Sequence, residues 1–296
     1  MNERQLSYVV AAVETGSFTQ AAARCLVSQP SLSASIARLE RELGVLLFHR
    51  VGRTIAPTDA CTALLPSARD AMRAVDGARR AVDAVRSGLA GELQLGVQPT
   101  VVASVIELLH DFRSRHPGVT IRMRSPGDDE SIAGMVASGR AELGVGDIEP
   151  HPALAWTAFR TESYVLVGTG DAGPDRPARR VGDLVDTPLV VPPRGSPTRA
   201  VIDALFAAAG VVPEIVMEVD HRDALLPLVA VGAGATIVPG SMVDGHVWPS
   251  LPVSALAPPV ERGIGIARRD AALTPAAQAL LRSVEAGTDA TEGRGR

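Results

Sequence analysis

The sequence contains few cysteines, no lysine, and no run near its start that resembles a signal peptide. Its two cysteines, Cys25 and Cys61, are too few for a disulfide framework or a zinc site with four cysteine ligands. All basic residues are arginine, and the apolar run at 8–13 is short and is closed by Glu14. We therefore expect a protein of the reducing cytoplasm, associated with the nucleoid if it binds DNA, with no metal and no cofactor.

An uninterrupted apolar segment long enough to cross a membrane is also missing. Residues 224–243 carry no charge, but five residues would break a spanning helix: Pro227, Gly232, Gly234, Pro239 and Gly240. A buried helix, a tight turn and a buried strand are expected there. The sequence predicts no membrane contact.

Recognisable catalytic motifs are absent from the sequence. It has no Gly-x-Ser-x-Gly and no His-Glu-x-x-His pattern, and its six histidines are scattered. Gly144-Val145-Gly146 would need a glycine five positions after Gly144 to form a dinucleotide-binding loop, where the chain has Glu149. The sequence therefore does not predict an enzyme.

The length and composition are those of a globular protein of about two domains. The 296 residues are 46% hydrophobic and 21% charged, with a formal net charge of −4. Residues 1–90 hold 11 arginines against 8 acidic residues, a charge of +3, whereas residues 91–296 carry −7. The N-terminal part is therefore the basic part of an acidic chain.

The first ninety residues follow a helical pattern. Apolar residues recur at three- to four-residue spacing over 6–13 and again over 32–43. Gly16 ends the first helix, Ser17 begins the second as its N-cap, and Ser28 begins the third. Two helices joined by such a short turn form a helix-turn-helix, whose second helix enters the major groove of DNA.

The outward face of the third helix carries short side chains that can meet base edges. They are Gln29, Ser31, Ser33, Ala34, Ser35 and Arg38. Residues 46–48 and 54–55 are expected to form a hairpin, with Arg50 and Arg53 placed for phosphates. The alternative for this segment is an ordinary three-helix bundle with a solvated polar face.

A long helix is expected over residues 59–89. Its apolar positions follow a heptad spacing typical of a two-helix seam: Leu64, Ala68, Ala71, Val75, Ala78, Val82, Val85 and Leu89. Pro66 and Gly77 should bend or loosen this helix. Because such a seam cannot bury itself alone, we expect a second subunit to supply the partner helix.

After residue 90 the pattern changes to alternating strands and helices. One succession runs over 93–146, and a similar one restarts at 164 and continues to 238. Two successive α/β lobes form a cleft, which is the usual location for a small ligand.

In order and spacing, the N-terminal motifs closely resemble the winged helix-turn-helix of LysR-type transcriptional regulators. They are Gly16 to Ala22, Val27 to Ser33, Leu39-Glu40, Leu43-Gly44 and Leu47 to Arg50. The resemblance implies that Ser28, Gln29, Pro30, Ser33 and Ala34 lie at the DNA face, with Arg50 and Arg53 in the wing. Cys61 replaces a common glycine of the family, which we interpret as a small buried thiol rather than a redox sensor.

The C-terminal part is similar to the effector-binding domain of the same family, which resembles periplasmic solute-binding folds with two Rossmann-like lobes. The matching positions are Phe112, His116-Pro117, 139–144, 224–226, 229–230, Gly232, Gly234 and Val238-Pro239. The implied organisation is an all-α winged helix-turn-helix domain, 1–58, a linker and dimerisation helix, 59–89, and an effector-binding α/β domain, 90–286. Lobe I would hold about 90–160 and 265–286, lobe II about 161–264, and the tail 287–296 would be disordered.

By the same resemblance, the cleft would be lined by Thr100, Asp128, Asp129, Asp147 and the stretch from Pro193 to Ser196. Helix N-termini favour an anion, which two neighbouring carboxylates would repel. The two aspartates are therefore also explained as caps of a helix at 130–138, the alternative being contact with an amine, a cation or a polyhydroxylated effector. Thr100 and Ser196 can equally be caps.

The sequence thus predicts a regulator that binds double-stranded promoter DNA and responds to a small-molecule effector. The resemblance implies a dimer of dimers, and contact with RNA polymerase if the protein is an activator. The alternative is a solute-binding or catalytic α/β protein whose helical N-terminal bundle does not bind DNA.

Overall fold

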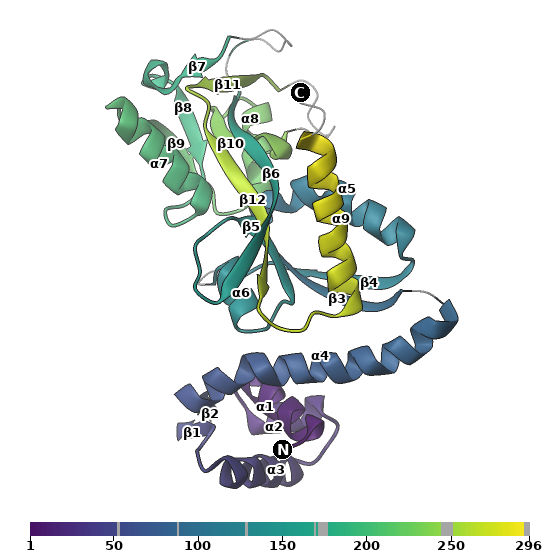
Figure 1. The fold of residues 1–296 in the computed structure, drawn as a ribbon. Helices are drawn as coiled ribbons and strands as arrows, with labels where there is room; N and C mark the ends of the chain where they lie inside the picture. The colour runs from purple at the N-terminus through teal and green to yellow at the C-terminus, as the bar shows by residue number, and fades with distance from the viewer. Residues whose placement is uncertain are drawn as a thin grey trace. The chain divides into compact units, whose positions relative to one another are not determined.

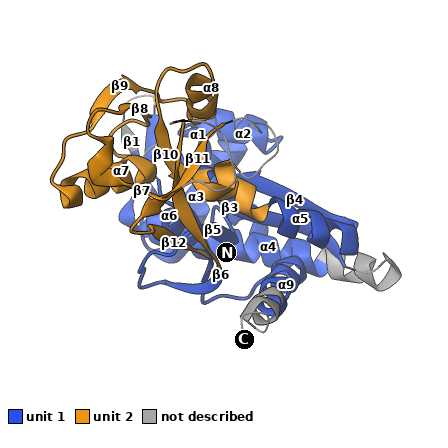
Figure 2. Cartoon of the chain, turned by 90° about the horizontal axis from the view of Figure 1, so that it is seen from above, with its two compact units in different colours: residues 1–99, 106–159, 265–296 blue, residues 100–105, 160–264 orange. Residues whose placement is uncertain are grey.

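The computed structural model describes residues 1–51, 54–87, 89–127, 130–168, 170, 177–243 and 251–292. The chain divides into two compact units (Figure 2). Unit 1 comprises Met1–Pro99, Ile106–Phe159 and Gly265–Arg296, and unit 2 comprises Thr100–Val105 and Arg160–Ile264. Within the described ranges, no helix is both long and apolar enough to cross a membrane.

The N-terminal part of unit 1 is a three-helix bundle of α1 (Glu3–Thr15), α2 (Phe18–Arg24) and α3 (Gln29–Leu43) (Figure 1). Asn2, Ser17 and Ser28 cap the three helices through their side chains. Gly16 and Gly44 adopt left-handed conformations, with φ of 62° and 71°, and end α1 and α3. The bundle core includes Val9, Ala12, Leu32, Ile36 and Leu39, all 1% exposed or less.

A short hairpin follows the bundle. Strands β1 (Phe48–Val51) and β2 (Thr54–Pro57) pair antiparallel, with Phe48 opposite Pro57. The N–H of Ile55 donates to the carbonyl of Gly16 at 3.3 Å, which ties the hairpin to the end of α1. This arrangement is the winged helix-turn-helix expected from the sequence.

Helix α4 (Asp59–Ser87) packs its first half against α1 of the same chain. Leu65 and Ala68 form a buried cluster with Leu6 and Val10, and Leu64, Ala71 and Met72 pack against it. The expectation that the whole seam awaits a partner helix is therefore wrong for Leu64, Ala68 and Ala71. The physical reason is that α1 has a second apolar stripe that α4 covers.

The α/β part of unit 1, called lobe I below, is built on a parallel sheet. Strands β3 (Ala90–Val97), β4 (Gly118–Arg124) and β5 (Leu143–Asp147) are ordered β4-β3-β5, and β12 (Glu261–Arg269) follows β5. Its helices are α5 (Val102–Arg115), which begins in unit 2 after a 3-10 turn (Pro99–Val101), α6 (Ile132–Ala137) and α9 (Pro275–Glu292).

Unit 2 is built around β6 (Leu154–Val167), which begins in unit 1. Strands β10 (Thr236–Pro239) and β11 (Val253–Ala257) pair antiparallel with β6, and β7 (Arg179–Arg180) pairs with β11. Strands β8 (Pro188–Val191) and β9 (Glu214–Glu218) pair parallel. The helices are α7 (Pro197–Ala209) and α8 (Leu225–Ala230), with 3-10 turns at Val181–Leu184, Arg222–Ala224 and Gly240–Met242.

The structure corrects two boundaries. Thr100–Val105 belongs to unit 2 rather than to the first lobe, because its polar side chains contact that unit, as described below. Helix α9 continues to Glu292, so the prediction of a disordered tail from residue 287 is wrong as far as residue 292. The added residues are mostly compatible with a helix, with Gly287 as the single weak former; 293–296 lie outside the described residues.

Candidate functional site

The first turn of α3 presents a polar surface to solvent. Ser28 caps the helix, with its Oγ accepting from the N–H of Ser31 at 3.4 Å and lying 2.8 Å from the Ser31 hydroxyl. Gln29, Pro30 and Ser31 are exposed, as are Ala34 and Arg38 one and two turns later. A helix start of this kind brings short side chains and backbone N–H groups to one surface, which suits contact with bases and phosphates.

Ser33 lies differently from the prediction. It is half-buried and lines a hollow of about 350 Å³ beside the hairpin, together with Phe18, Ile36, Ala37, Glu40, Leu46, Phe48 and His49. Ser35 is half-buried as well. The fully outward face of α3 is therefore narrower than the sequence pattern indicates, because α3 packs against more neighbours than a single buried stripe requires.

Glu40 joins α3 to the hairpin, a role that the sequence analysis missed. Its Oε1 accepts from the backbone N–H of Leu47 at 2.7 Å and of Phe48 at 3.3 Å. The Phe48 ring also packs edge-on against Phe18, with centroids 5.4 Å apart. The signal in the sequence was a glutamate one turn before Gly44, within reach of the N–H groups that follow the helix. The side chain of Arg50, and Arg53 as a whole, lie outside what the structure describes.

Thr100 belongs to a buried polar cluster of unit 2. Its hydroxyl and carbonyl oxygens accept from the guanidinium of Arg262 at 2.9 and 2.7 Å. Arg262 also forms an ion pair with Glu162, which accepts from Ser104 at 3.1 Å, and all four residues are 9% exposed or less. The explanation of Thr100 as a helix cap is therefore wrong, since its hydroxyl satisfies a buried arginine.

Asp147 lies at the end of β5 and pairs with Gln98 in unit 1. The amide of Gln98 donates to Oδ2 of Asp147 at 2.8 Å, and its oxygen accepts the N–H of Asp147 at 2.9 Å. This reciprocal pair joins the carboxyl ends of two neighbouring parallel strands, where ligands of α/β folds bind. The carboxylate of Asp147 is thus held in a defined position.

Ser196 caps α7, with its Oγ accepting from the N–H of Arg199 at 3.2 Å. Pro193, in the preceding loop, is half-buried. Arg199 is 2% exposed and donates to Glu218, at 2.8 Å, and to the carbonyl of Pro192, at 3.1 Å, which fixes the loop before α7. The cap role of Ser196 is therefore observed.

Asp128 and Asp129 lie outside the described residues. The explanation that they cap the following helix is nevertheless wrong, because α6 begins at Ile132 and its N-cap is Ser131. The hydroxyl of Ser131 accepts from the N–H of Gly134 at 3.0 Å. In the described part of the chain, no group of three or more His, Cys, Asp or Glu side chains is placed to hold a metal ion.

Comparison with known proteins accounts for nearly the whole chain. Residues 3–62 match the model of the bacterial regulatory helix-turn-helix protein, lysR family, and residues 86–288 match that of the LysR substrate binding domain. The HTH-type transcriptional regulator TfdS of Cupriavidus pinatubonensis is 36% identical over 250 residues, covering 82% of this chain and 83% of that protein. The regulator IlvR of Caulobacter vibrioides is 32% identical over 294 residues, covering 96% of this chain and 97% of IlvR.

Solved structures agree with this similarity. Full-length CbnR complexed with its target DNA is 26% identical, with a TM-score of 0.64 over 96% of this chain and 99% of CbnR. Full-length OxyR of Pseudomonas aeruginosa shares the fold at 23% identity, with a TM-score of 0.70 over 96% of this chain and 97% of OxyR. With its N-terminal helix-turn-helix domain and its C-terminal substrate-binding domain, this chain belongs to the LysR family of transcriptional regulators.

Proposed function

We propose that this protein binds promoter DNA through α3 and the β1–β2 hairpin, and that a small-molecule effector held by the α/β domain modulates this binding. The observation that carries the proposal is the solvent-facing first turn of α3, which Glu40 joins to the hairpin. The structure of CbnR with its target DNA supports it, because the two chains share their fold over almost their full lengths.

In this proposal, α3 reads bases and the hairpin anchors the protein to phosphates. The residues assigned to the DNA face are Ser28, Gln29, Pro30, Ser31, Ser33, Ala34 and Arg38, with Arg50 and Arg53 on the phosphates. Gln29 is the strongest candidate for base discrimination, because a carboxamide can pair with the edge of adenine. Arginine side chains in the wing supply charge, which acts on every DNA sequence alike.

The effector contacts that we assign are Thr100, Asp128, Asp129, Asp147, Pro193 and Ser196. Two of these polar groups already have defined geometry, since Thr100 accepts from Arg262 and Asp147 is held by Gln98. The Thr100 hydroxyl still has its proton to donate to a ligand. Such fixed polar groups give a small-molecule site its specificity.

We also propose a homodimer through the second half of α4, assembled further into a dimer of dimers. Val75 is half-buried and Ala78 is exposed, beyond the part of α4 that α1 covers. An apolar seam of this length gains burial only from a second helix. Two half-sites on a DNA duplex match such a two-fold protein, and an activator of this kind would also contact RNA polymerase.

The DNA proposal is tested with the full-length protein and the DNA upstream of its own gene. Arg50→Ala should weaken binding to specific and unrelated DNA alike and reduce the salt slope by about one unit, the value expected for one lost phosphate contact. Gln29→Ala should instead narrow the difference between specific and unrelated DNA, by about 1–3 kcal/mol. If the wild type shows no DNA affinity at low salt, the alternative of a solute-binding protein with a helical N-terminal bundle is supported instead.

The effector proposal is tested by thermal unfolding with a panel of metabolites. A ligand at a hundred times its dissociation constant stabilises the folded protein by about 2.7 kcal/mol, which is readily detected. Thr100→Val and Ser196→Ala should reduce the shift for any hit. Ser104→Ala is the matched control, because it loosens the same buried cluster through Glu162 without touching the Thr100 hydroxyl. A hit that the protein converts into product would contradict the assignment as a regulator.

A further inference from the structure

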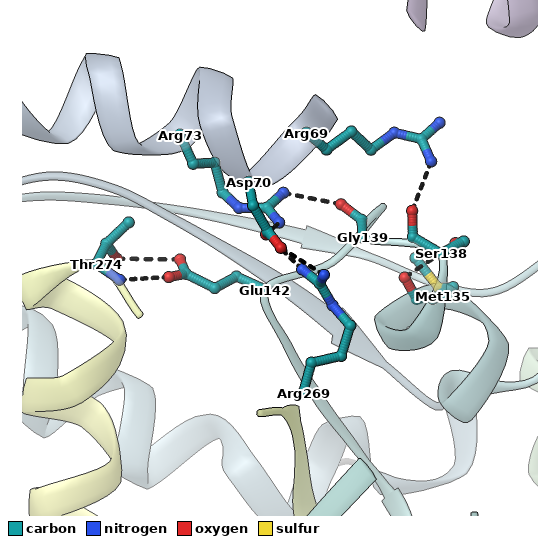
Figure 3. Close-up of polar contacts among 9 residues, drawn as sticks. All are labelled: Arg69, Asp70, Arg73, Met135, Ser138, Gly139, Glu142, Arg269 and Thr274. Carbon is teal, nitrogen blue, oxygen red and sulfur yellow. Dashed lines mark hydrogen bonds and ion pairs between the residues drawn. The ribbon is translucent and has the colours of Figure 1, made fainter. Parts of the chain in front are cut away.

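One face of α4 lies against lobe I of the same chain (Figure 3). Pro66, Arg69, Asp70 and Arg73 follow the spacing of a single helix face and are called the latch face below. None of them is fully exposed, and Arg69 is only 8% exposed although it is an arginine on a helix surface. Long charged side chains are rarely buried unless they are paired, so this face has a defined partner.

The first partner is the C-terminal end of α6. Nη1 of Arg69 donates to the carbonyl of Ser138 at 2.7 Å, and Nη1 of Arg73 donates to the carbonyl of Gly139 at 2.8 Å (Figure 3). Ser138 is the C-cap of α6, so these carbonyls belong to the end of a helix, where acceptors have no partner within the helix. Two guanidinium groups at that end complement both the free acceptors and the negative end of the helix dipole.

The second partner is Arg269, at the end of β12. Its two terminal nitrogens donate to the two carboxylate oxygens of Asp70, which also forms an ion pair with Arg73. Burial acts to raise the pKa of Asp70, but the hydrogen bonds from Arg269 and the charge of Arg73 outweigh it and hold the pKa below its usual value. The latch face is therefore ionised at neutral pH and bridges two separate elements of lobe I.

The backbones also come close at this contact. Gly139 has a φ of 72°, and a Cβ built on it would lie 3.2 Å from Cα of Pro66 and 3.3 Å from the Pro66 carbonyl oxygen. Any larger residue would push the two elements apart. The contact thus includes closely packed backbone in addition to long side chains.

On its other side, α4 is attached to the DNA-binding bundle. Leu65 and Ala68 are buried against α1. Nη2 of Arg69 reaches Glu14 of α1 at 3.5 Å, and Glu14 pairs with Arg24 of α2 at 2.7 Å. The same arginine therefore contacts both the bundle and the end of α6.

We propose that the latch face docks the DNA-binding bundle of each chain onto its own lobe I, and that α6 is the element through which a bound effector acts on this contact. Helix α6 has six residues and is therefore about 9 Å long, so it moves as one short rigid piece. Its N-cap, Ser131, follows the two aspartates assigned to the effector, and its C-cap receives Arg69. The role of α6 rests on the proposed function, whereas the docking itself does not.

The docking is tested by amide hydrogen exchange on the full-length protein without DNA or metabolite. Arg269→Asp places a second carboxylate opposite Asp70, and Asp70→Arg places a third cation beside Arg73 and Arg269. Each change should accelerate exchange on the element that does not carry it, by about tenfold or more: residues 66–76 of α4 for Arg269→Asp, and residues 136–142 for Asp70→Arg. The double variant Asp70→Arg/Arg269→Asp restores opposite charges and should recover at least part of the protection.

The matched control is Arg122→Asp, the same charge change in an exposed ion pair within lobe I, with Glu92. It should leave exchange in residues 66–76 unchanged. The docking is overturned if the single variants alter exchange only on their own element, or if the double variant is no more protected than either single one. Because no DNA or ligand is used, these outcomes are separate from a failure of the proposed function.

The transmission through α6 is tested once a metabolite gives a thermal shift. Saturating metabolite should change exchange in residues 66–76 of the wild type, and this change should be absent in Arg269→Asp, where the docking is already broken. An equal change in both proteins would overturn the role of α6 and leave the docking intact.

Discussion

The carboxylate of Glu40 accepts the backbone N–H of Leu47 at 2.7 Å, and this bond fixes the hairpin relative to the helix that is proposed to read DNA. The contact spans only seven residues and includes the tight turn at Gly44. The position of the wing is therefore set by a side chain of the helix itself, before any DNA is present.

We expect Glu40→Ala to weaken DNA binding without touching the DNA. It removes the acceptor of two partly buried N–H groups, at a cost of about 1–3 kcal/mol in the free energy of unfolding of the bundle. Glu42→Ala, on the exposed side of the same helix, should change stability by less than about 0.5 kcal/mol. Urea unfolding and fluorescence anisotropy with labelled DNA measure the two effects; equal losses for both variants would contradict this role of Glu40.

The proposed dimer seam predicts a difference between neighbouring positions of α4. Val75→Glu combined with Val82→Glu should place like charges across the seam and shift the protein toward monomer, with a loss of DNA affinity. The control is Ala74→Glu, an exposed position off the seam, which should leave the oligomeric state unchanged. Sedimentation velocity at micromolar concentration decides: a wild-type protein that is already monomeric removes the basis of the proposal.

Glu142 should make the stability of the protein decrease as the pH rises. Burial raises the pKa of Glu142 above its ordinary value of 4.5, although the Thr274 N–H and hydroxyl donate to the carboxylate. The folded state therefore binds the proton more tightly than the unfolded state, and the associated stability is lost as the pH rises from 4.5 through the raised pKa.

Glu142→Gln removes this titration and keeps an acceptor for Thr274. We expect the variant to be at least as stable as the wild type at pH 7, with the difference shrinking or reversing near the ordinary pKa of 4.5. Urea unfolding of both proteins at several pH values measures it. Parallel pH profiles for the two proteins would show that Glu142 does not titrate in this range.

The buried thiol of Cys61 should be chemically inert. Burial, with a smaller contribution from Glu40, raises the pKa of Cys61 to about 11, against a partial opposing effect of Arg69. At pH 8 the reactive thiolate is a fraction of about 0.001, so iodoacetamide should modify half-buried Cys25 first and Cys61 only after unfolding. Peptide mass spectrometry over time measures both rates. Prompt modification of Cys61 in the folded protein would restore the redox interpretation.

The bundle was the part that the sequence predicts best. Short-range rules decide it: caps at Ser17 and Ser28, left-handed glycines after α1 and α3, and apolar residues at helical spacing. The DNA face follows from the same periodicity. What periodicity does not contain is which neighbour covers a stripe, so it assigned Ala68 to a partner subunit although α1 covers it.

The α/β part was predicted as alternating elements, but its long-range pairings were not. Strand β6 has fourteen residues, of which the apolar pattern marks only the last four, because the first ten alternate in burial along the strand. The contacts of Thr100 depend on Arg262, which lies 162 residues later in the chain. Local patterns do not encode such distant partners, and the latch between Asp70 and Arg269 escaped prediction for the same reason.

The order of strands in lobe I bears on the order in which the chain completes its fold during synthesis. Strands β4, β3 and β5 emerge early, but β12, the neighbour of β5, is made only after the whole of residues 160–264. Until then, the buried edge of β5, with Leu143 and Val145, has no strand beside it. Unit 2 can form while this edge stays open, so the nascent chain depends on its last segments to protect lobe I from pairing with another copy.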